Sequence, residues 1–251
     1  MDIKSSSPPF FSPSPTNTRL RRFVISALFT FGLLTLLGRF STVFQSALWS
    51  HNDAPTAPPA TESEYLVPLE AHIMSKCPDA KDCMRDLLVP TMQQVSDKTQ
   101  FTLSFIGTTD PDSDAVECKH GETECLGNML IVCASHLYPS PVIHLGFAMC
   151  MVGQFNKIPE RAMVENCALE HGVDFGKLND CVSEEGEGIG LLRESMERSQ
   201  NAGVTKSCTI RLDNKIRCIR DGAEWKDCEG GYTVKSLVND VEAAYKKGNG
   251  L

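Results

Sequence analysis

The fold of this chain is decided by residues 67–106, which read VPLEAHIMSKCPDAKDCMRDLLVPTMQQVSDKTQFTLSFI. Apolar residues alternate with others over Val67–Ile73, and this period of two predicts a β-strand. Apolar residues then recur at helical spacing over about Ala80–Gln94, which predicts a helix with a kink at Pro90. A second strand is expected at Phe101–Ile106. This order predicts a βαβ unit with parallel strands and a right-handed crossover.

The rest of the chain continues this plan after one interruption. Gly107–Glu185 breaks the rhythm of strands and helices, and we predict a helical insertion there that disulfides hold together. A helix is expected at Ile189–Ala202, a β-hairpin with strands at Thr209–Leu212 and Ile216–Ile219, and a last helix at Val234–Lys246. The order of elements predicts a mixed α/β (α+β) domain with a thioredoxin-like fold and a disulfide-rich helical insertion after the second strand.

The composition indicates a compartment and argues against two kinds of ligand. Eleven cysteines is a high number for 251 residues, and this density is typical of proteins in oxidising compartments. A zinc site is the competing interpretation, but the sequence has no paired Cys-x2-Cys knuckles, so we expect disulfides and neither a metal nor a cofactor. The odd number leaves at least one thiol unpaired or engaged in exchange. The net charge of −8 argues against a nucleic-acid partner.

The N-terminal part of the chain differs in composition from the rest. It contains a Ser- and Pro-containing segment, then arginines, then an apolar run, then a segment with Pro, Ala, Thr and Ser. We expect four parts along the chain: a disordered cytosolic tail at 1–22, a transmembrane signal anchor at 23–44, a polar stalk at 45–64 and the folded domain at 65–251.

The apolar run Phe23–Gly38 sets the expected topology. Basic residues precede the run and few follow it, which places the N-terminus in the cytosol and the cysteine-rich domain in the lumen. We therefore expect a single-pass type II membrane protein of the secretory system. The alternative is a cleaved signal peptide, which would release the domain as a secreted protein. The long N-terminal region and the lack of an Ala-x-Ala pattern favour the anchor.

A second stretch, Cys118–Asn128, reads CKHGETECLGN and is followed by Cys133. Cysteines spaced this closely, with Gly and charged residues between them, predict a tight disulfide-bound loop. The pattern resembles the signature of the gamma-interferon-inducible lysosomal thiol reductases (GILT), which show Cys-Gln-His-Gly, then Glu-Cys, then Asn, then a further Cys. Lys119 replaces the Gln here.

This resemblance covers roughly residues 65–185 and has three implications. It implies the thioredoxin-like fold again, now from a different signal. It implies thiol–disulfide chemistry on protein substrates in an endolysosomal or vacuolar compartment. It also implies, together with their clustering, that the six cysteines of the insertion pair among themselves. These are Cys118, Cys125, Cys133, Cys150, Cys167 and Cys181.

Cys77 is the expected nucleophile. It lies where the first predicted strand meets the first predicted helix, which is the position of the reactive cysteine in a thioredoxin-like fold. Unsatisfied N–H groups and the positive end of the dipole at a helix N-terminus stabilise a thiolate. A thiolate attacks a substrate disulfide and forms a mixed disulfide, which a second thiol then resolves.

The chain departs from the family pattern at both candidates for the second thiol. The family has Cys-x-x-Cys, whereas five residues separate Cys77 from Cys83, so that in a continuous helix Cys83 faces away from Cys77. Ser207-Cys208 stands where the family shows Val-Pro, and Cys208 is therefore expected close to Cys77. Cys77 and Cys208 either exchange as a redox pair or form a structural bridge that leaves the protein inactive.

Two functions follow as expectations. The first is a luminal thiol–disulfide oxidoreductase, attached to the membrane, that reduces or exchanges disulfides of protein substrates, with Cys77, Cys83 and Cys208 as candidate catalytic residues. The alternative is a catalytically inactive, disulfide-stapled binding module that recognises polypeptides. The altered cysteine pair and the missing proline favour the module, and Cys77 at the helix start favours the enzyme.

Overall fold

The computed structural model describes residues 64–183 and 187–251. The fold described here is that of one compact unit, Glu62–Leu251. Within the described ranges, no helix has both the length and the apolar character needed to cross a bilayer. The expected tail, the expected anchor and nearly all of the expected stalk lie outside the described residues.

The predicted βαβ unit is confirmed. Strand β1 (Val67–Ile73) is followed by a continuous helical segment made of α2 (Pro78–Cys83), a π-helical turn (Met84–Leu88) and α3 (Val89–Val95), and then by β2 (Thr99–Phe105). The two strands are parallel along their full length. The unit buries one continuous core between the sheet and the helical segment.

The helical segment accommodates Pro90 through the π-helical turn that precedes it. The N–H group of Val89 donates to the carbonyl of Met84, five residues back, so the hydrogen-bond ladder is displaced by one residue. Pro90 then falls in the first turn of α3, where a helix needs no N–H donor. The kink expected at Pro90 is therefore replaced by a wide turn just before it, and the helix continues.

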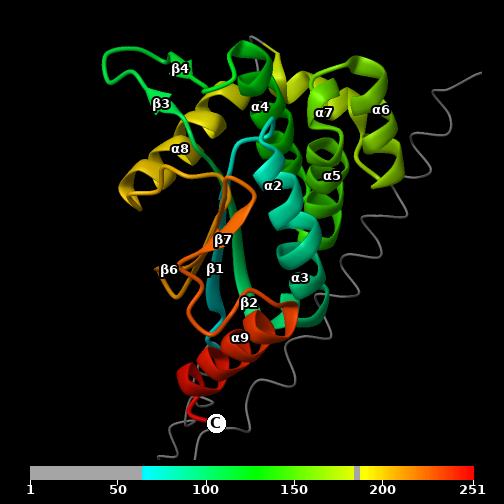
Figure 1. The fold of residues 1–251 in the computed structure, drawn as a ribbon. Coiled ribbons are helices and arrows are strands. Elements are labelled where there is room, and N and C mark those ends of the chain that lie inside the picture. Colours follow the sequence, from blue (N-terminus) through cyan, green and yellow to red (C-terminus); the bar gives the residue numbers. More distant parts are fainter. Residues whose placement is uncertain (1–63, 184–186) are drawn as a thin grey trace, which may run out of the picture. The chain divides into compact units, whose positions relative to one another are not determined.

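A single five-stranded sheet carries the domain, in the order β2-β1-β5-β6-β7 (Figure 1). The predicted hairpin is confirmed as β5 (Thr209–Leu212) and β6 (Lys215–Asp221), and β5 runs antiparallel to β1. Asp213 and Asn214 both have positive φ angles, of 49° and 63°, as the tight turn of a two-residue hairpin requires. The sequence did not predict β7 (Glu224–Lys226), which extends the sheet by a short edge strand.

Two further helices pack on the βαβ unit. Helix α8 (Gly188–Asn201) packs against β2, while α9 (Val234–Gly248) contacts α3 and β1 (Figure 1). The expected helical insertion is confirmed, and it also contains a small hairpin. Its elements are β3 (Thr108–Thr109), β4 (Val116–Glu117), α4 (Glu122–Leu137), α5 (Pro141–Gly153), α6 (Arg161–Glu170) and α7 (Phe175–Val182). The two helices predicted after it are observed as α8 (Gly188–Asn201) and α9 (Val234–Gly248).

The pairing expected of the insertion cysteines is confirmed. Its three disulfides join Cys118 to Cys125, Cys133 to Cys181, and Cys150 to Cys167. The second links α4 to α7 and the third links α5 to α6, so the four helices are tied in two pairs. Between the helices lies an apolar core that continues into the core of the βαβ unit.

A buried histidine in α5 makes the stability of this core dependent on pH. The Nδ1 atom of His144 lies 3.0 Å from the carbonyl oxygen of Tyr138, and its ring stacks on Phe101. Burial lowers the pKa of His144 below its usual value of 6.5, against the opposing effect of that hydrogen bond. The unfolded chain therefore binds a proton first, and the folded state loses stability as the pH falls below about 6.5.

We expect His144→Asn to flatten this acid dependence, because an amide keeps a donor for the Tyr138 carbonyl and does not titrate. The measurement is the free energy of unfolding between neutral and acidic pH. His136→Asn, at an exposed position in α4, is the matched control and should keep the slope of the unmodified protein. Equal slopes in all three proteins would contradict the assignment to His144.

Candidate active site

Cys77 lies at the junction of β1 and α2, as expected from the sequence. It is the N-cap of α2, with an extended backbone (φ −98°, ψ 126°), and its side chain is half-buried. Its Sγ atom lies 3.7 Å from the carbonyl oxygen of Ser207, to which the thiol donates. All eleven cysteines lie within the described ranges, and Cys77 is the one without a disulfide partner.

The other two candidate residues form a bridge with each other. Cys83 and Cys208 are joined by a disulfide with their Cα atoms 6.2 Å apart, and both side chains are fully buried. The bridge connects the end of α2 to the residue just before β5, and the Ser207–Cys208 peptide bond is cis. Cys77 thus contacts Ser207, the residue preceding Cys208, but the bridge considered between Cys77 and Cys208 is not formed, because Cys208 is bonded to Cys83.

The residues of the Cys118–Asn128 stretch hold the loop that leads into Cys77. The N–H group of Ser75 donates to Oδ1 of Asn128 at 2.9 Å, and the N–H group of Lys76 donates to Oε2 of Glu124 at 3.3 Å. Glu124 is fully buried and also accepts hydrogen bonds from the backbone and ring of His120. The sequence pointed to this stretch as a pattern but gave no sign that it contacts the loop before the candidate nucleophile.

Gly127, in the same stretch, permits the close approach of α4 to this loop. A Cβ atom at this position would lie 2.8 Å from Oγ of Ser75 and 2.3 Å from Cγ2 of Ile158. Both separations are too short for any side chain, so only glycine brings α4 near enough for Glu124 and Asn128 to reach the backbone of Ser75 and Lys76. The stretch therefore combines a close contact with two hydrogen-bond acceptors.

Comparison with known proteins finds a family to which this arrangement is similar. Residues 68–171 match the model of the family described as gamma interferon inducible lysosomal thiol reductase (GILT). This match covers less than half of the chain. A relative, the GILT-like protein C02D5.2 of Caenorhabditis elegans, is 23% identical over 190 residues, which are 70% of this chain and 57% of the relative.

Two solved structures from bacteria are similar to this chain. A structure from Nitrosomonas europaea, of a suggested protein disulfide isomerase, covers 73% of this chain and 98% of its own with a TM-score of 0.51 and 10% identity. The thiol-disulfide exchange protein alpha-DsbA2 of Wolbachia pipientis covers 71% of this chain and 81% of its own, with a TM-score of 0.48 and 12% identity. At such low identity, the first likeness supports the thioredoxin-like fold alone.

The GILT signature yields a prediction at Glu124. We expect Glu124→Gln to lower the free energy of unfolding by about 1.5–3 kcal/mol, the usual contribution of hydrogen bonds to a charged group, and to slow alkylation of Cys77. An amide must turn an N–H group toward one of the donors of His120 or Lys76, so the loop before Cys77 loses its fixed position. Urea unfolding and the rate of iodoacetamide labelling measure the two effects.

Glu122→Gln is the matched control for this prediction. Glu122 lies on the first turn of the same helix, two residues away, and is exposed to solvent. The same change of charge there should leave the stability within about 0.5 kcal/mol of that of the unmodified protein. Equal effects at both positions would show that the charge, and not the contact with the loop, is responsible.

Asp79 and the turn between β6 and β7 fix the first turn of α2. The carboxylate of Asp79 accepts hydrogen bonds from the N–H groups of Gly222 and Ala223, both at 2.9 Å. Arg220 lies 3.8 Å from the same carboxylate and 3.5 Å from that of Asp82. Asp79 carries the negative charge nearest in sequence to Cys77. Because its carboxylate is engaged by these donors, its repulsion of a thiolate at Cys77 is limited.

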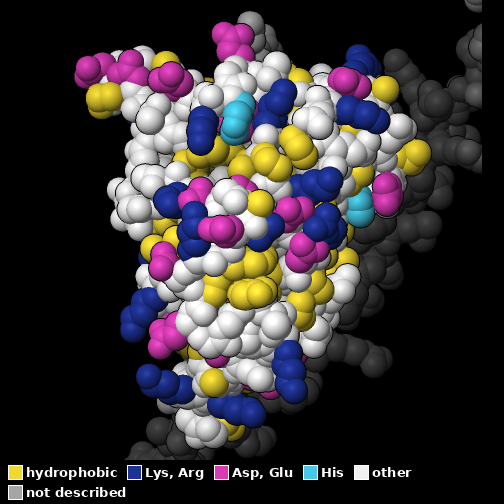
Figure 2. Space-filling model, viewed as in Figure 1, with side chains coloured by type: hydrophobic (Ala, Val, Ile, Leu, Met, Phe, Trp, Pro, Cys, Tyr) yellow, Lys and Arg dark blue, Asp and Glu magenta, His cyan; other side chains and the backbone are white. Residues whose placement is uncertain are grey.

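An apolar groove opens beside Cys77. Met74, Ile106 and Val204 form a small buried cluster against which Cys77 packs, and the groove that they line has a volume of about 590 Å³. Gly107, Lys119 and Thr205 are among its other lining residues. Figure 2 shows hydrophobic side chains exposed near the start of α2, with Lys, Arg and His side chains around them.

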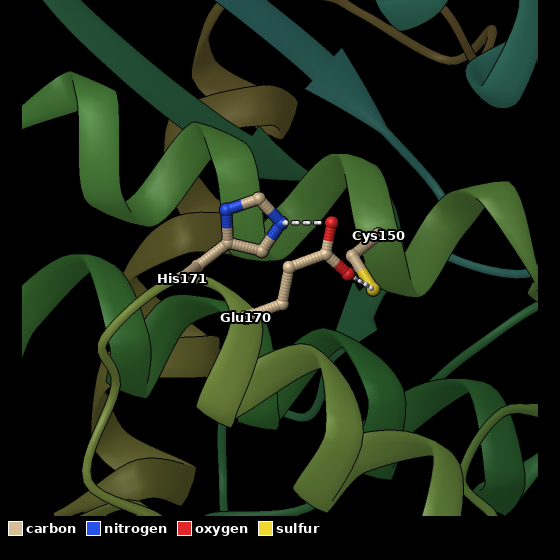
Figure 3. A group of neighbouring side chains, drawn as sticks. All are labelled: Cys150, Glu170 and His171. Atoms are coloured by element: carbon tan, nitrogen blue, oxygen red, sulfur yellow. Dashed lines mark hydrogen bonds and ion pairs between the residues drawn. The ribbon is translucent and has the colours of Figure 1, made fainter.

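One group of side chains in the insertion has the composition of a metal site. Sγ of Cys150 lies 3.8 Å from one oxygen of Glu170, and Nε2 of His171 lies 3.9 Å from the other (Figure 3). Cys150 is bonded to Cys167, however, and metals bind a thiolate, which a disulfide sulfur is not. The cluster does not fit a metal ion in this oxidation state.

Proposed function

We propose that this protein is a thiol–disulfide oxidoreductase that reduces or exchanges disulfides of protein substrates through a mixed disulfide at Cys77. The observation that carries the proposal is the position of the one unpaired cysteine. Cys77 lies at the start of α2, half-buried, and the residues of the GILT signature hold the loop before it.

The local geometry suits a thiolate nucleophile. The first N–H groups of a helix have no partner within the helix, and Cys77 is the N-cap of α2, although its side chain makes no capping hydrogen bond with them. The thiolate attacks one sulfur of a substrate disulfide, forms a bond to it and releases the other sulfur as a thiolate. The thiol donates to the Ser207 carbonyl, and it must lose this proton before it attacks.

The groove and the disulfides support the class of substrate and the compartment. The groove lined by Met74, Ile106 and Val204 offers apolar contacts to a polypeptide whose disulfide is exposed. Five disulfides in one domain persist only where the surroundings are oxidising, which favours the luminal side of the secretory and endolysosomal system. The single-pass anchor expected at residues 23–44 would keep the domain at the membrane there.

Reduction of a denatured disulfide-containing protein, followed at acidic and neutral pH, tests the proposal. We expect turnover in the presence of thiols, and acid quenching followed by peptide mapping should find substrate bound to Cys77. If no turnover occurs at any pH and Cys77 does not react with alkylating agents, the proposal fails. Retention of an unfolded polypeptide in the groove would then identify the protein as a binding module.

A further inference from the structure

We infer that Cys77 acts as a single thiol, and that a thiol from outside the chain discharges its mixed disulfide while the Cys83–Cys208 bridge stays closed. This inference rests on the proposed function and names its second substrate. That substrate is a thiol, which either a small molecule such as reduced glutathione or a protein dithiol can supply.

The first argument is the complete set of cysteine partners. Ten of the eleven cysteines are paired in five disulfides, and every cysteine lies in the described part of the chain. The pairs are Cys83–Cys208, Cys118–Cys125, Cys133–Cys181, Cys150–Cys167 and Cys218–Cys228. No second thiol is therefore present to resolve a mixed disulfide at Cys77.

The second argument is the position of the Cys83–Cys208 bridge. Both sulfurs belong to residues with 0% exposure, within the core formed by α2 and the sheet. An external thiolate must reach a disulfide sulfur to open it, and access governs the rate of this exchange. A bridge enclosed in this way is protected, whereas Cys77 is half-buried and lies beside the groove.

The third argument is that the bridge has a structural role at the reactive thiol. It anchors Cys208, and the residue before it, Ser207, places its carbonyl oxygen against Sγ of Cys77. Ser207 also accepts a hydrogen bond from the N–H group of Met74 through its hydroxyl, at 2.8 Å. Opening the bridge in each cycle would release the segment that lines the site, so a closed bridge is the arrangement that keeps the site formed.

The reaction balances with two external thiols. The Cys77 thiolate bonds to one substrate sulfur and the other leaves as a thiolate. An external thiolate then attacks Sγ of Cys77 and releases the second substrate sulfur, which leaves Cys77 bonded to the external thiol. A second external thiolate restores Cys77 and forms the external disulfide. The substrate disulfide gains two electrons and two protons, and the two external thiols lose them.

The test uses the intact protein and an aryl disulfide whose released thiolate is coloured. Without other thiols, we expect one equivalent of coloured thiolate per chain and then no more. The Cys77 peptide should then carry one arylthio group, bonded through a mixed disulfide. Reduced glutathione and a reduced thioredoxin are then added in separate reactions. At least one should restore turnover in proportion to its concentration, and the two arms identify the source of the thiol.

Peptide mapping during turnover decides the state of the bridge. Cys83 and Cys208 should remain joined and unlabelled, and Cys218–Cys228, which is partly exposed at Cys228, shows whether the reductant opens accessible bridges. A disulfide from Cys77 to Cys83 or Cys208, or a second equivalent of colour after brief dithiol treatment, would overturn the single-thiol inference alone. A Cys77 that never reacts would overturn this inference and the proposed function together.

Discussion

Replacing Cys77 by Ser should abolish disulfide reduction. A hydroxyl has nearly the same size as a thiol but cannot form the mixed disulfide, and loss of a nucleophile costs catalysis on the order of 10⁶-fold in a well-studied hydrolase. We therefore expect the rate to fall to that of the external thiol alone. Because Cys77 has no disulfide partner, the free energy of unfolding should change by less than about 1 kcal/mol.

The control for this variant removes sulfur atoms elsewhere. Cys218→Ser combined with Cys228→Ser opens a bridge at the β6–β7 edge of the sheet while Cys77 stays in place. That double variant should lose stability but keep thiol-dependent reduction at temperatures where it is folded. Full reduction by Cys77→Ser would exclude a mechanism that uses this thiol.

Opening the Cys133–Cys181 bridge, by replacing both cysteines with Ala, should lower the free energy of unfolding by about 4 kcal/mol. The bridge closes a loop with a sequence separation of 48, so its loss restores much freedom to the unfolded chain. It also joins α4 to α7 with both sulfurs buried, so that their removal leaves a space in the core.

The double replacement at Cys218 and Cys228 is again the matched comparison. This bridge has a sequence separation of 10, and the same relation predicts a loss of about 3 kcal/mol. Urea denaturation of the three proteins measures the difference, provided that the slopes agree. A smaller loss for Cys133–Cys181 than for Cys218–Cys228 would show that loop closure does not determine its contribution.

Local patterns in the sequence predicted much of the fold. The alternation over Val67–Ile73 and the helical spacing after it are properties of adjacent residues, and both elements are observed with nearly the expected bounds. The pairing of the insertion cysteines among themselves, expected from their clustering and from the resemblance to the GILT family, is also observed. The short strand Glu224–Lys226 was missed because three residues carry no periodicity.

The candidate site was less predictable because long-range contacts build it. Helical geometry correctly turned Cys83 away from Cys77, but its partner, Cys208, lies 125 residues further along the chain. Only the position of β5 beside β1 brings the two together. In the same way, the contacts of Glu124 and Asn128 with the loop before Cys77 depend on where α4 packs, and no spacing in the sequence encodes that distance.

The contact between α4 and the loop at Ser75 and Lys76 bears on how this protein can be engineered. Cys77 lies in the βαβ unit, whereas Glu124 and Asn128 lie in the helical insertion. Trimming the chain to the βαβ unit, or transplanting the Cys77 loop onto another scaffold, would separate this loop from the residues that hold it. A redesign must therefore carry the insertion and the Cys77 loop together.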